Sequence, residues 1–119
     1  MPDCGGTWFL PHHLGPARAL ALALTAEPLP AEKAADWGLI WKAVEDAELM
    51  PQALALAQKL SAQSPQAVAA IKNAVHAAAA RTLDAALDHE RDAQRELGYG
   101  ADFAEGVAAF LEKRAPRFG

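Results

Sequence analysis

The first residues of the chain that could take part in chemistry are a carboxylate, Asp3, and the glycine pair Gly5 and Gly6. Proline, aspartate and two glycines within residues 2–7 favour a tight turn whose backbone can pass close to a ligand. A helical pattern follows, and the free N–H groups of a helix start would point towards that ligand. The segment therefore indicates a ligand-facing loop. It also fits a solvated Asp3 at a flexible terminus, or a helix cap.

Two other interpretations of this loop are weaker. Cys4 stands next to the carboxylate, but no His or Asn at a motif-like spacing supports a thiol nucleophile, so we interpret Cys4 as a small packing residue. Gly5 and Gly6 lack the lysine and the further glycines of a phosphate-binding loop. We therefore interpret them as a place of close approach to an acyl group.

A second pair of candidate residues, Phe110 and Lys113, lies near the other end of the chain. At a spacing of three they share one face of a predicted helix, so that an aromatic plane and an ammonium could face one ligand. Phe would supply stacking area and Lys a point charge for phosphate. The commoner alternative places Phe110 in a helix core and leaves Lys113 solvated. We expect Glu112, Arg114 and Arg117 to form an exposed surface of mixed charge.

The four histidines do not form a metal site. His12 and His13 are adjacent and point to different sides of a helix, and His76 and His89 stand alone on predicted helices. No cysteine or carboxylate at a suitable spacing completes a zinc site. We therefore predict no metal and interpret the histidines as helix-surface residues.

Composition limits the classes of function. The chain has 119 residues, one domain at most, and a formal net charge of −4 without a basic block, which argues against nucleic-acid or membrane partners. A single cysteine excludes an internal disulfide and fits a reducing compartment. No signal-peptide pattern opens the chain, and the most apolar run, residues 17–26, is too short to cross a bilayer. We expect a soluble, cytoplasmic protein.

The elements that must position the candidate residues are helices, because alanine and leucine dominate and β-branched residues are sparse. Glycines, prolines and capping residues divide the chain into predicted helices at residues 6–14, 17–25, 31–37, 46 to about 62, 65–78, 82–98 and 101–114. Residues 39–44 have the only strand-like composition. A lone strand needs a partner for its backbone groups, so this segment either pairs with a part of a larger fold or is not a strand.

Five stretches carry a family likeness, in the order and spacing of the family and over essentially the whole chain: residues 2–7 (PDCGGT), 18–22 (RALAL), 31–40 (AEKAADWGLI), 70–72 (AIK) and 105–114 (EGVAAFLEKR). They resemble the C-terminal part of the crotonase superfamily, the enoyl-CoA hydratases and isomerases. The resemblance implies a mostly α chain, the helical C-terminal half of a crotonase-type α/β fold, with at most one short strand at about 39–44. It implies a single fragment, 1–119, with an active-site loop at 2–7, a helical region at 8–98 and a CoA-contacting helix at 101–114.

Three further stretches narrow the likeness: residues 7–11 (TWFLP), 37–41 (WGLIW) and 87–94 (LDHERDAQ). They resemble the ring-1,2-epoxyphenylacetyl-CoA isomerases of aerobic phenylacetate degradation. The two tryptophan-bearing motifs favour this subfamily over a generic hydratase. His12 departs from the pattern, because relatives often carry arginine there.

The resemblance implies a catalytic role for Asp3. Isomerases of this superfamily move a proton along the acyl chain of a CoA thioester, while two backbone N–H groups stabilise the enolate oxygen. Several of them place the acid in this loop, just ahead of the glycine pair, whereas hydratases use two glutamates farther upstream. Asp3 is thus implied to be the acid/base. For an aromatic-ring epoxide the analogous step is ring expansion to an oxepin thioester.

The same resemblance implies the binding residues and partners. It assigns substrate binding to Gly5, Gly6 and Trp8, and coenzyme A binding to Phe110 and Lys113, which would hold the adenosine or its phosphate from a neighbouring subunit. Coenzyme A enters as part of the acyl thioester substrate, and no permanently bound cofactor is implied. The family implies a homo-oligomer, a trimer or a hexamer.

The resemblance further implies that the chain begins after the core that supplies the oxyanion-hole N–H groups. We therefore expect the isolated chain to be weakly active or inactive, and to self-associate through apolar helix faces. Two alternatives stay open: a standalone helical CoA-binding or oligomerisation module without catalysis, and a helical structural protein whose likeness is accidental.

Overall fold

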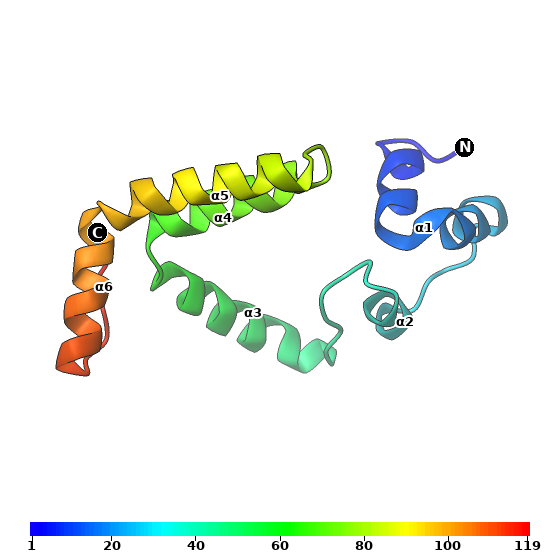
Figure 1. Ribbon diagram of the computed structural model, residues 1–119. Helices are drawn as coiled ribbons and strands as arrows, with labels where there is room; N and C mark the ends of the chain where they lie inside the picture. The colour runs from blue at the N-terminus through cyan, green and yellow to red at the C-terminus, as the bar shows by residue number, and fades with distance from the viewer. The chain divides into compact units, whose positions relative to one another are not determined.

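The computed structural model describes all residues, 1–119, and consists of six helices without a β-strand (Figure 1). The helices are α1 (Gly6–Thr25), α2 (Ala31–Asp36), α3 (Asp46–Ser61), α4 (Pro65–Ala78), α5 (Leu83–Gly98) and α6 (Ala101–Glu112). The chain divides into two compact units, residues 1–49 and 50–119.

In the first unit, α1 is two helical segments that meet at a kink. Gly15 has φ 75° and ψ 164°, a left-handed backbone that glycine tolerates, and Pro16 follows it. The predicted break between residues 14 and 17 is thereby confirmed. The indole ring of Trp37 joins α1 to α2, because the Arg18 guanidinium lies 4.9 Å and the Lys33 ammonium 4.8 Å from the ring centroid. An exposed cation–π contact of this kind contributes about 0.5–1 kcal/mol.

The segment 39–44, for which at most one short strand was expected, consists of bends and irregular backbone. The physical reason lies in its first two residues. The backbone N–H groups of Leu39 and Ile40 both donate to the carbonyl of Ala34, at 2.9 and 3.4 Å, so the chain folds back on the end of α2. A strand would need those donors for a ladder, and the segment has no neighbouring strand.

The second unit contains most of α3 and all of α4, α5 and α6. Helices α4 and α5 lie side by side and antiparallel, and α6 packs against α5 (Figure 1). The predicted starts of α4 and α5 are confirmed, because the Ser64 and Thr82 hydroxyls each accept a hydrogen bond from the backbone N–H three residues later, at 3.3 Å. Such N-caps satisfy donors that the first turn leaves free.

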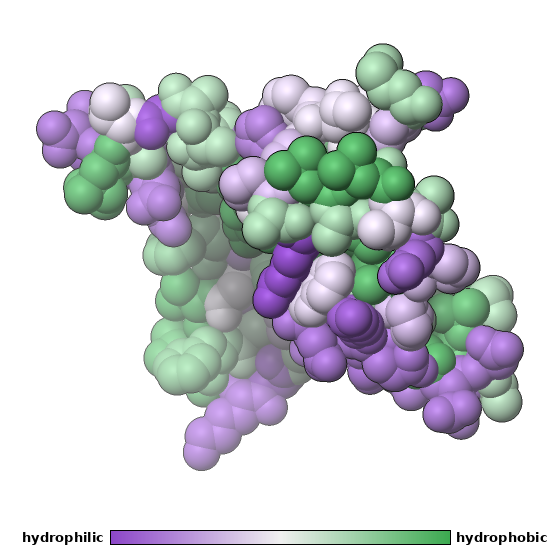
Figure 2. All heavy atoms as spheres, turned by 90° about the vertical axis from the view of Figure 1, so that its right-hand side faces the viewer, coloured by the Kyte–Doolittle hydropathy of each residue, from purple (hydrophilic) through white to green (hydrophobic).

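Little of the chain is buried. Leu14, Ala19, Ala34, Ala109 and Ser64 are the buried residues. Large apolar side chains on every helix except the short α2 are exposed, and hydrophobic atoms lie at the surface in Figure 2. No helix is both long enough and apolar enough to cross a membrane. The helices therefore present apolar faces that neither unit covers.

Candidate functional site

Residues 3–6 form the predicted tight turn at the start of α1. The backbone N–H of Gly6 donates to the carbonyl of Asp3 at 2.8 Å, and the two central residues, Cys4 and Gly5, have φ values of 48° and 85°. Two successive positive φ values and this hydrogen bond define a type I′ turn. The carbonyl of Gly5 then accepts from the N–H groups of Trp8 and Phe9, both at 2.9 Å. The loop is thus locked to the first turn of the helix.

Gly5 is required here by conformation and by space. Its positive φ is one that L side chains rarely adopt, and a Cβ at this position would lie 2.9 Å from Cε2 of Phe9. Gly6 is also closely packed, though less tightly, since a Cβ there would lie 3.2 Å from Cβ of Pro2. The space that a Cβ would need at either glycine is therefore taken by Phe9 or Pro2, and the close approach of a ligand to this backbone stays a prediction.

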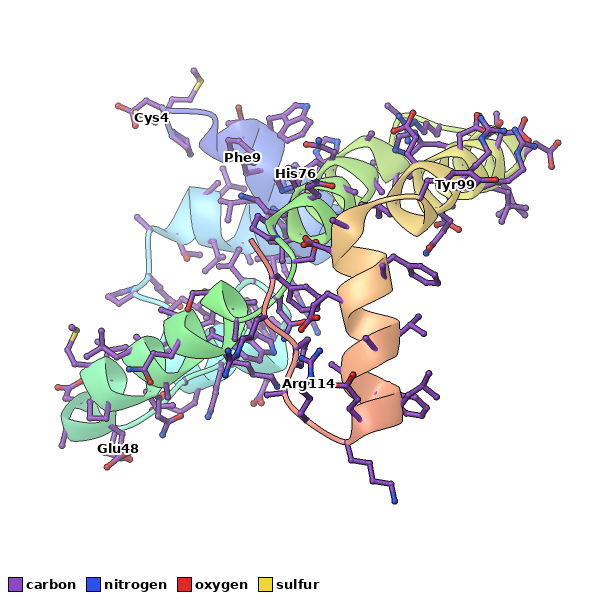
Figure 3. The ribbon with its side chains drawn as sticks, turned by 90° about the vertical axis from the view of Figure 1, so that its left-hand side faces the viewer. Cys4, Phe9, Glu48, His76, Tyr99 and Arg114 are labelled. Atoms are coloured by element: carbon purple, nitrogen blue, oxygen red, sulfur yellow. The ribbon has the colours of Figure 1, made fainter.

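Asp3 holds the first position of this turn, and its side chain is exposed. Its backbone carbonyl is used by Gly6, while no hydrogen bond or ion pair engages its carboxylate. Cys4 is also exposed and is a free thiol (Figure 3), which does not fit the interpretation of Cys4 as a packing residue. The turn therefore leaves the Asp3 carboxylate exposed and unpaired.

Trp8, the third predicted substrate-binding residue, belongs to an aromatic cluster on the first turns of α1. Its ring meets Phe9 edge-on, with 4.9 Å between centroids, and stacks on His12 at 4.0 Å. His12 Nδ1–H donates to the Trp8 carbonyl at 2.6 Å, which holds the imidazole in place. Trp8 is 57% exposed, so the cluster forms a surface beside the turn.

An apolar pocket of about 260 Å³ lies next to the same turn, within the first unit. Its lining combines Gly6 and Leu10, from before the kink in α1, with Leu20 and others from after it; the full set is Gly6, Thr7, Leu10, Pro11, Pro16, Ala19, Leu20 and Ala23. The kink at Gly15 creates the pocket by turning one half of the helix towards the other. Leu10 and Leu20 were not predicted as pocket residues, although the predicted break is the feature that brings them together.

In the second unit, Phe110 is 82% exposed and does not lie in a helix core. Lys113 follows the last helical residue in a left-handed conformation, φ 55° and ψ 40°. Its N–H donates to the carbonyl of Phe110 at 3.3 Å, and the N–H of Arg114 to that of Ala109 at 3.0 Å. These two bonds define a Schellman C-cap, in which glycine usually holds the left-handed position.

A cluster of charged residues, which we call the clasp, consists of Glu105, Glu112, Arg114 and the backbone of Arg117. Nη1 and Nη2 of Arg114 donate to the two oxygens of Glu105 at 2.6 and 3.0 Å, and Nε donates to Glu112 at 2.6 Å. The N–H of Arg117 adds a bond to Glu105 at 2.7 Å. These hydrogen bonds, led by those from Arg114, lower the pKa of Glu105 to about 2.

Glu112, Arg114 and Arg117 are exposed, as expected, and the clasp adds specific pairing of Arg114 (Figure 3) within this charged surface. The chain after α6 turns back along the helix, which brings residues nine and twelve positions apart into hydrogen-bonding distance. A helix pairs residues three or four apart. The sequence could not reveal the clasp, because its partners are joined by the reversal of the chain.

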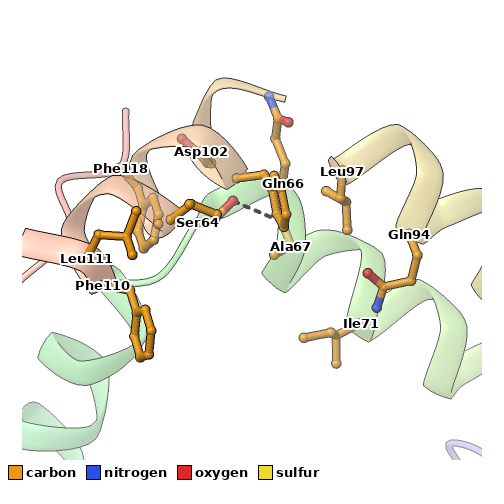
Figure 4. A pocket seen from close by; sticks show the side chains of 13 residues that line it. Ser64, Gln66, Ala67, Ile71, Gln94, Leu97, Asp102, Phe110, Leu111 and Phe118 are labelled. Atoms are coloured by element: carbon orange, nitrogen blue, oxygen red, sulfur yellow. Dashed lines mark hydrogen bonds between the residues drawn. The ribbon is translucent and has the colours of Figure 1, made fainter. Parts of the chain in front are cut away.

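A larger pocket, of about 470 Å³, lies between α4, α5, α6 and the C-terminal segment (Figure 4). Its lining is mostly apolar and includes Phe110 and Phe118. One oxygen of Asp102, Oδ2, is buried there without a hydrogen-bond partner. None of the polar lining residues was predicted as a site residue; Ser64, Gln66 and Asp102 stand at helix starts, and Gln94 lies within α5.

The structure brings Asp3, Gly5, Gly6 and Trp8 together in the first unit, and Phe110 and Lys113 together in the second. No group of three or more His, Cys, Asp or Glu residues is arranged to hold a metal ion.

The chain is similar to known proteins in sequence and in fold. A family model described as enoyl-CoA hydratase/isomerase matches residues 1–119. Over 118 residues, 99% of this chain, the sequence is 50% identical to the 1,2-epoxyphenylacetyl-CoA isomerase of Escherichia coli and 51% identical to a probable enoyl-CoA hydratase of Rhodobacter capsulatus. A solved enoyl-CoA hydratase from a Polaromonas species matches with a TM-score of 0.91 at 36% identity over 99% of this chain.

These matches cover 45%, 46% and 46% of the respective relatives. The chain therefore spans about half the length of the proteins that it matches.

Proposed function

Because this chain belongs to the enoyl-CoA hydratase/isomerase family, within the crotonase superfamily, and has the helical part of that fold, we propose that it isomerises a CoA thioester. Asp3 would be the acid/base that takes a proton from one carbon of the acyl group and returns it to another. Backbone N–H groups would stabilise the enolate oxygen meanwhile. The acyl thioester of coenzyme A is the substrate, and no permanent cofactor takes part.

The observation that carries the proposal is the geometry of the turn at the start of α1. Asp3 is exposed, its carboxylate makes no hydrogen bond or ion pair, and Gly5 and Gly6 in the same turn carry no side chain. A thioester could approach this backbone with its reacting carbons next to the carboxylate. The apolar pocket of about 260 Å³ that Gly6 shares would receive part of the acyl group.

The proposed acyl group is a ring epoxide. The E. coli relative, 50% identical, is named as an isomerase of 1,2-epoxyphenylacetyl-CoA, and the aromatic cluster of Trp8, Phe9 and His12 suits an aryl substrate. The reaction would be expansion of the epoxidised ring to an oxepin, an isomerisation that gains and loses no atoms. A straight-chain enoyl-CoA is the substrate to compare with it.

Phe110 and Lys113 are proposed to bind the coenzyme A nucleotide. Both are presented at the end of α6, the ring 82% exposed and the ammonium without an ion pair. The ring would stack on the adenine and the ammonium would meet a phosphate. The proposed assembly is a cytoplasmic homo-oligomer.

The proposal is tested in a chimera, because the chain spans about half of its relatives. The chain would replace the matching 118 residues of the E. coli isomerase, and turnover of the ring-epoxide thioester would be followed. We expect the chimera to be active. We expect the chain alone to be at least about 10²-fold slower, because loss of oxyanion-hole donors alone costs about 10²–10³.

The role of Asp3 is tested in the same chimera with Asp3→Asn, and with Asp36→Asn as the matched control. Asp36 is an exposed carboxylate on α2 of the same unit. General acid–base catalysis contributes about 10²–10⁴-fold, so kcat should fall by that factor for the first variant and stay unchanged for the second. Full activity of an Asp3→Asn chimera would refute the assignment.

A CoA-binding module without catalysis is the second candidate function. It is favoured by the placement of Phe110 and Lys113 in a compact unit that does not contain Asp3. In that case the chain alone would bind coenzyme A, while the chimera would remain inactive on both thioesters.

A further inference from the structure

Lys113 has a backbone conformation that its side chain disfavours. It holds the left-handed position of the C-cap of α6, with φ 55° and ψ 40°. Residues with a Cβ avoid this conformation, and helices usually place glycine there. A lysine at this position therefore has to be held by its surroundings.

The clasp is what holds it. Arg114 is the residue directly after Lys113. Its Nη1 and Nη2 donate hydrogen bonds, at 2.6 and 3.0 Å, to the carboxylate of Glu105 in the second turn of α6. The N–H of Arg117 bonds the same carboxylate at 2.7 Å. The chain after Lys113 is thus tied to the body of the helix, and Lys113 is fixed between the helix end and this tie.

The clasp also leaves the Lys113 ammonium free. Glu112 directly precedes Lys113, but its carboxylate is bonded to Nε of Arg114 at 2.6 Å. Arg114 therefore engages both acidic side chains of the clasp, and no ion pair involves Lys113. An unpaired ammonium carried by a fixed backbone can bind an external anion, whereas one paired with Glu112 would first have to leave it.

We propose that Glu105 and Arg114 are positioning residues, which hold Lys113 so that its ammonium, together with the exposed ring of Phe110, receives the 3′-phosphate end of coenzyme A. This inference rests on the proposed function, in which Phe110 and Lys113 bind the nucleotide. It adds two residues that do not touch the ligand. They act by fixing the backbone of Lys113 and by neutralising the acids beside it.

The test compares coenzyme A with 3′-dephospho-coenzyme A, which lacks the proposed partner of Lys113. Dissociation constants for both ligands would be measured by amide NMR titration of the 119-residue chain, which also reports whether α6 is folded. We expect the unsubstituted chain to prefer coenzyme A about tenfold, typical of one charge-assisted contact. Glu105→Gln should reduce this preference to about twofold, because a glutamine amide cannot accept both hydrogen bonds from the Arg114 guanidinium as a carboxylate does.

Two further variants separate positioning from stability. Lys113→Gly places the favoured residue in the left-handed cap and removes the ammonium, so the melting temperature should rise while the phosphate preference disappears. Asp88→Asn, the matched control, removes the exposed carboxylate that Arg91 bonds at 2.6 Å on α5. It should leave the tenfold preference intact.

The outcomes are distinguishable. If the unsubstituted chain binds neither ligand, or binds both equally, the proposed nucleotide binding fails and this inference fails with it. If Lys113→Gly loses the preference but Glu105→Gln keeps it, the binding proposal stands and the positioning role is overturned. If Glu105→Gln loses the amide signals of α6, the Arg114→Lys variant is measured instead. It keeps the positive charge at residue 114 but lacks the paired guanidinium donors that bind both oxygens of Glu105. A reduced preference then supports the role, and an unchanged one overturns it.

Discussion

Gly5 is the residue on whose conformation the turn of the candidate site depends. Its φ of 85° belongs to the type I′ turn that begins at Asp3, and the Phe9 ring occupies the space that a Cβ would need. Both constraints require a residue without a Cβ at this position. The turn that holds Asp3 therefore depends on the absence of a Cβ at residue 5.

We predict that Gly5→Ala destabilises the chain by about 1–2 kcal/mol, the cost of a left-handed conformation for a residue with a Cβ, with the clash against Phe9 in addition. Urea unfolding followed by circular dichroism measures the change. Gly98→Ala is the matched control, because Gly98 ends α5 with no atom within 4 Å of its would-be Cβ. It should leave stability unchanged or raise it by up to about 1 kcal/mol.

Glu105 makes stability depend on pH in a defined window. Its pKa is about 2 in the folded chain against an ordinary value of 4.5, because Arg114 and the N–H of Arg117 bond the ionised form. A lowered folded-state pKa contributes stability that is fully present above about 4.5 and is lost as pH falls towards 2.

We therefore predict that the melting temperature of the unsubstituted chain exceeds that of Glu105→Gln at pH 6, and that the difference shrinks between pH 4.5 and pH 2. Scanning calorimetry at several pH values measures it. Asp88→Asn serves as the comparison on α5. A difference that is constant from pH 6 to pH 2 would contradict the role of Glu105.

The boundaries of several helices follow from their capping residues. The starts of the helices predicted at residues 65 and 82 rested on capping residues, and the hydroxyls of Ser64 and Thr82 are the caps in the structure. The break at Gly15 and the end of α2 near Gly38 were predicted in the same way. These signals work because each acts within one turn of the helix that it begins or ends.

We predict that Ser64→Ala destabilises the chain by about 1 kcal/mol, because it removes the acceptor for the N–H of Ala67 from a buried position. Chemical denaturation measures the change. Ser61→Ala, at the end of α3, is the matched control, since the Ser61 hydroxyl donates to a carbonyl and caps no helix start. Equal effects of the two substitutions would contradict the capping role.

Many large apolar side chains of the chain are exposed, and those on α4 and α5 form a continuous example. Ile71 and Val75 on α4 are 62% and 66% exposed, and Leu87 on the neighbouring α5 is 53% exposed. Together they line one side of the helix pair. An apolar face of this kind favours association with a second protein surface.

We predict that the chain self-associates, so that sedimentation velocity gives a mass above 12.6 kDa that rises with concentration. Val75→Glu should shift the chain towards the monomer, because it introduces a charge into the apolar face. Asn73→Glu adds the same charge at an exposed polar position of α4 and should leave association unchanged. A 12.6 kDa species at every concentration would contradict the prediction.

The sequence alone predicted the helical class, the positions of the helix starts and the likeness to the enoyl-CoA hydratase/isomerase family. It did so because caps, breaks and motifs are local and can be read over a few residues. It left open whether residues 39–44 form a strand, where Phe110 lies and how Arg114 is paired. These depended on the three-dimensional arrangement, since a strand needs a neighbour, burial needs a covering surface, and the ion pair of Glu105 with Arg114 exists only because the chain reverses after α6.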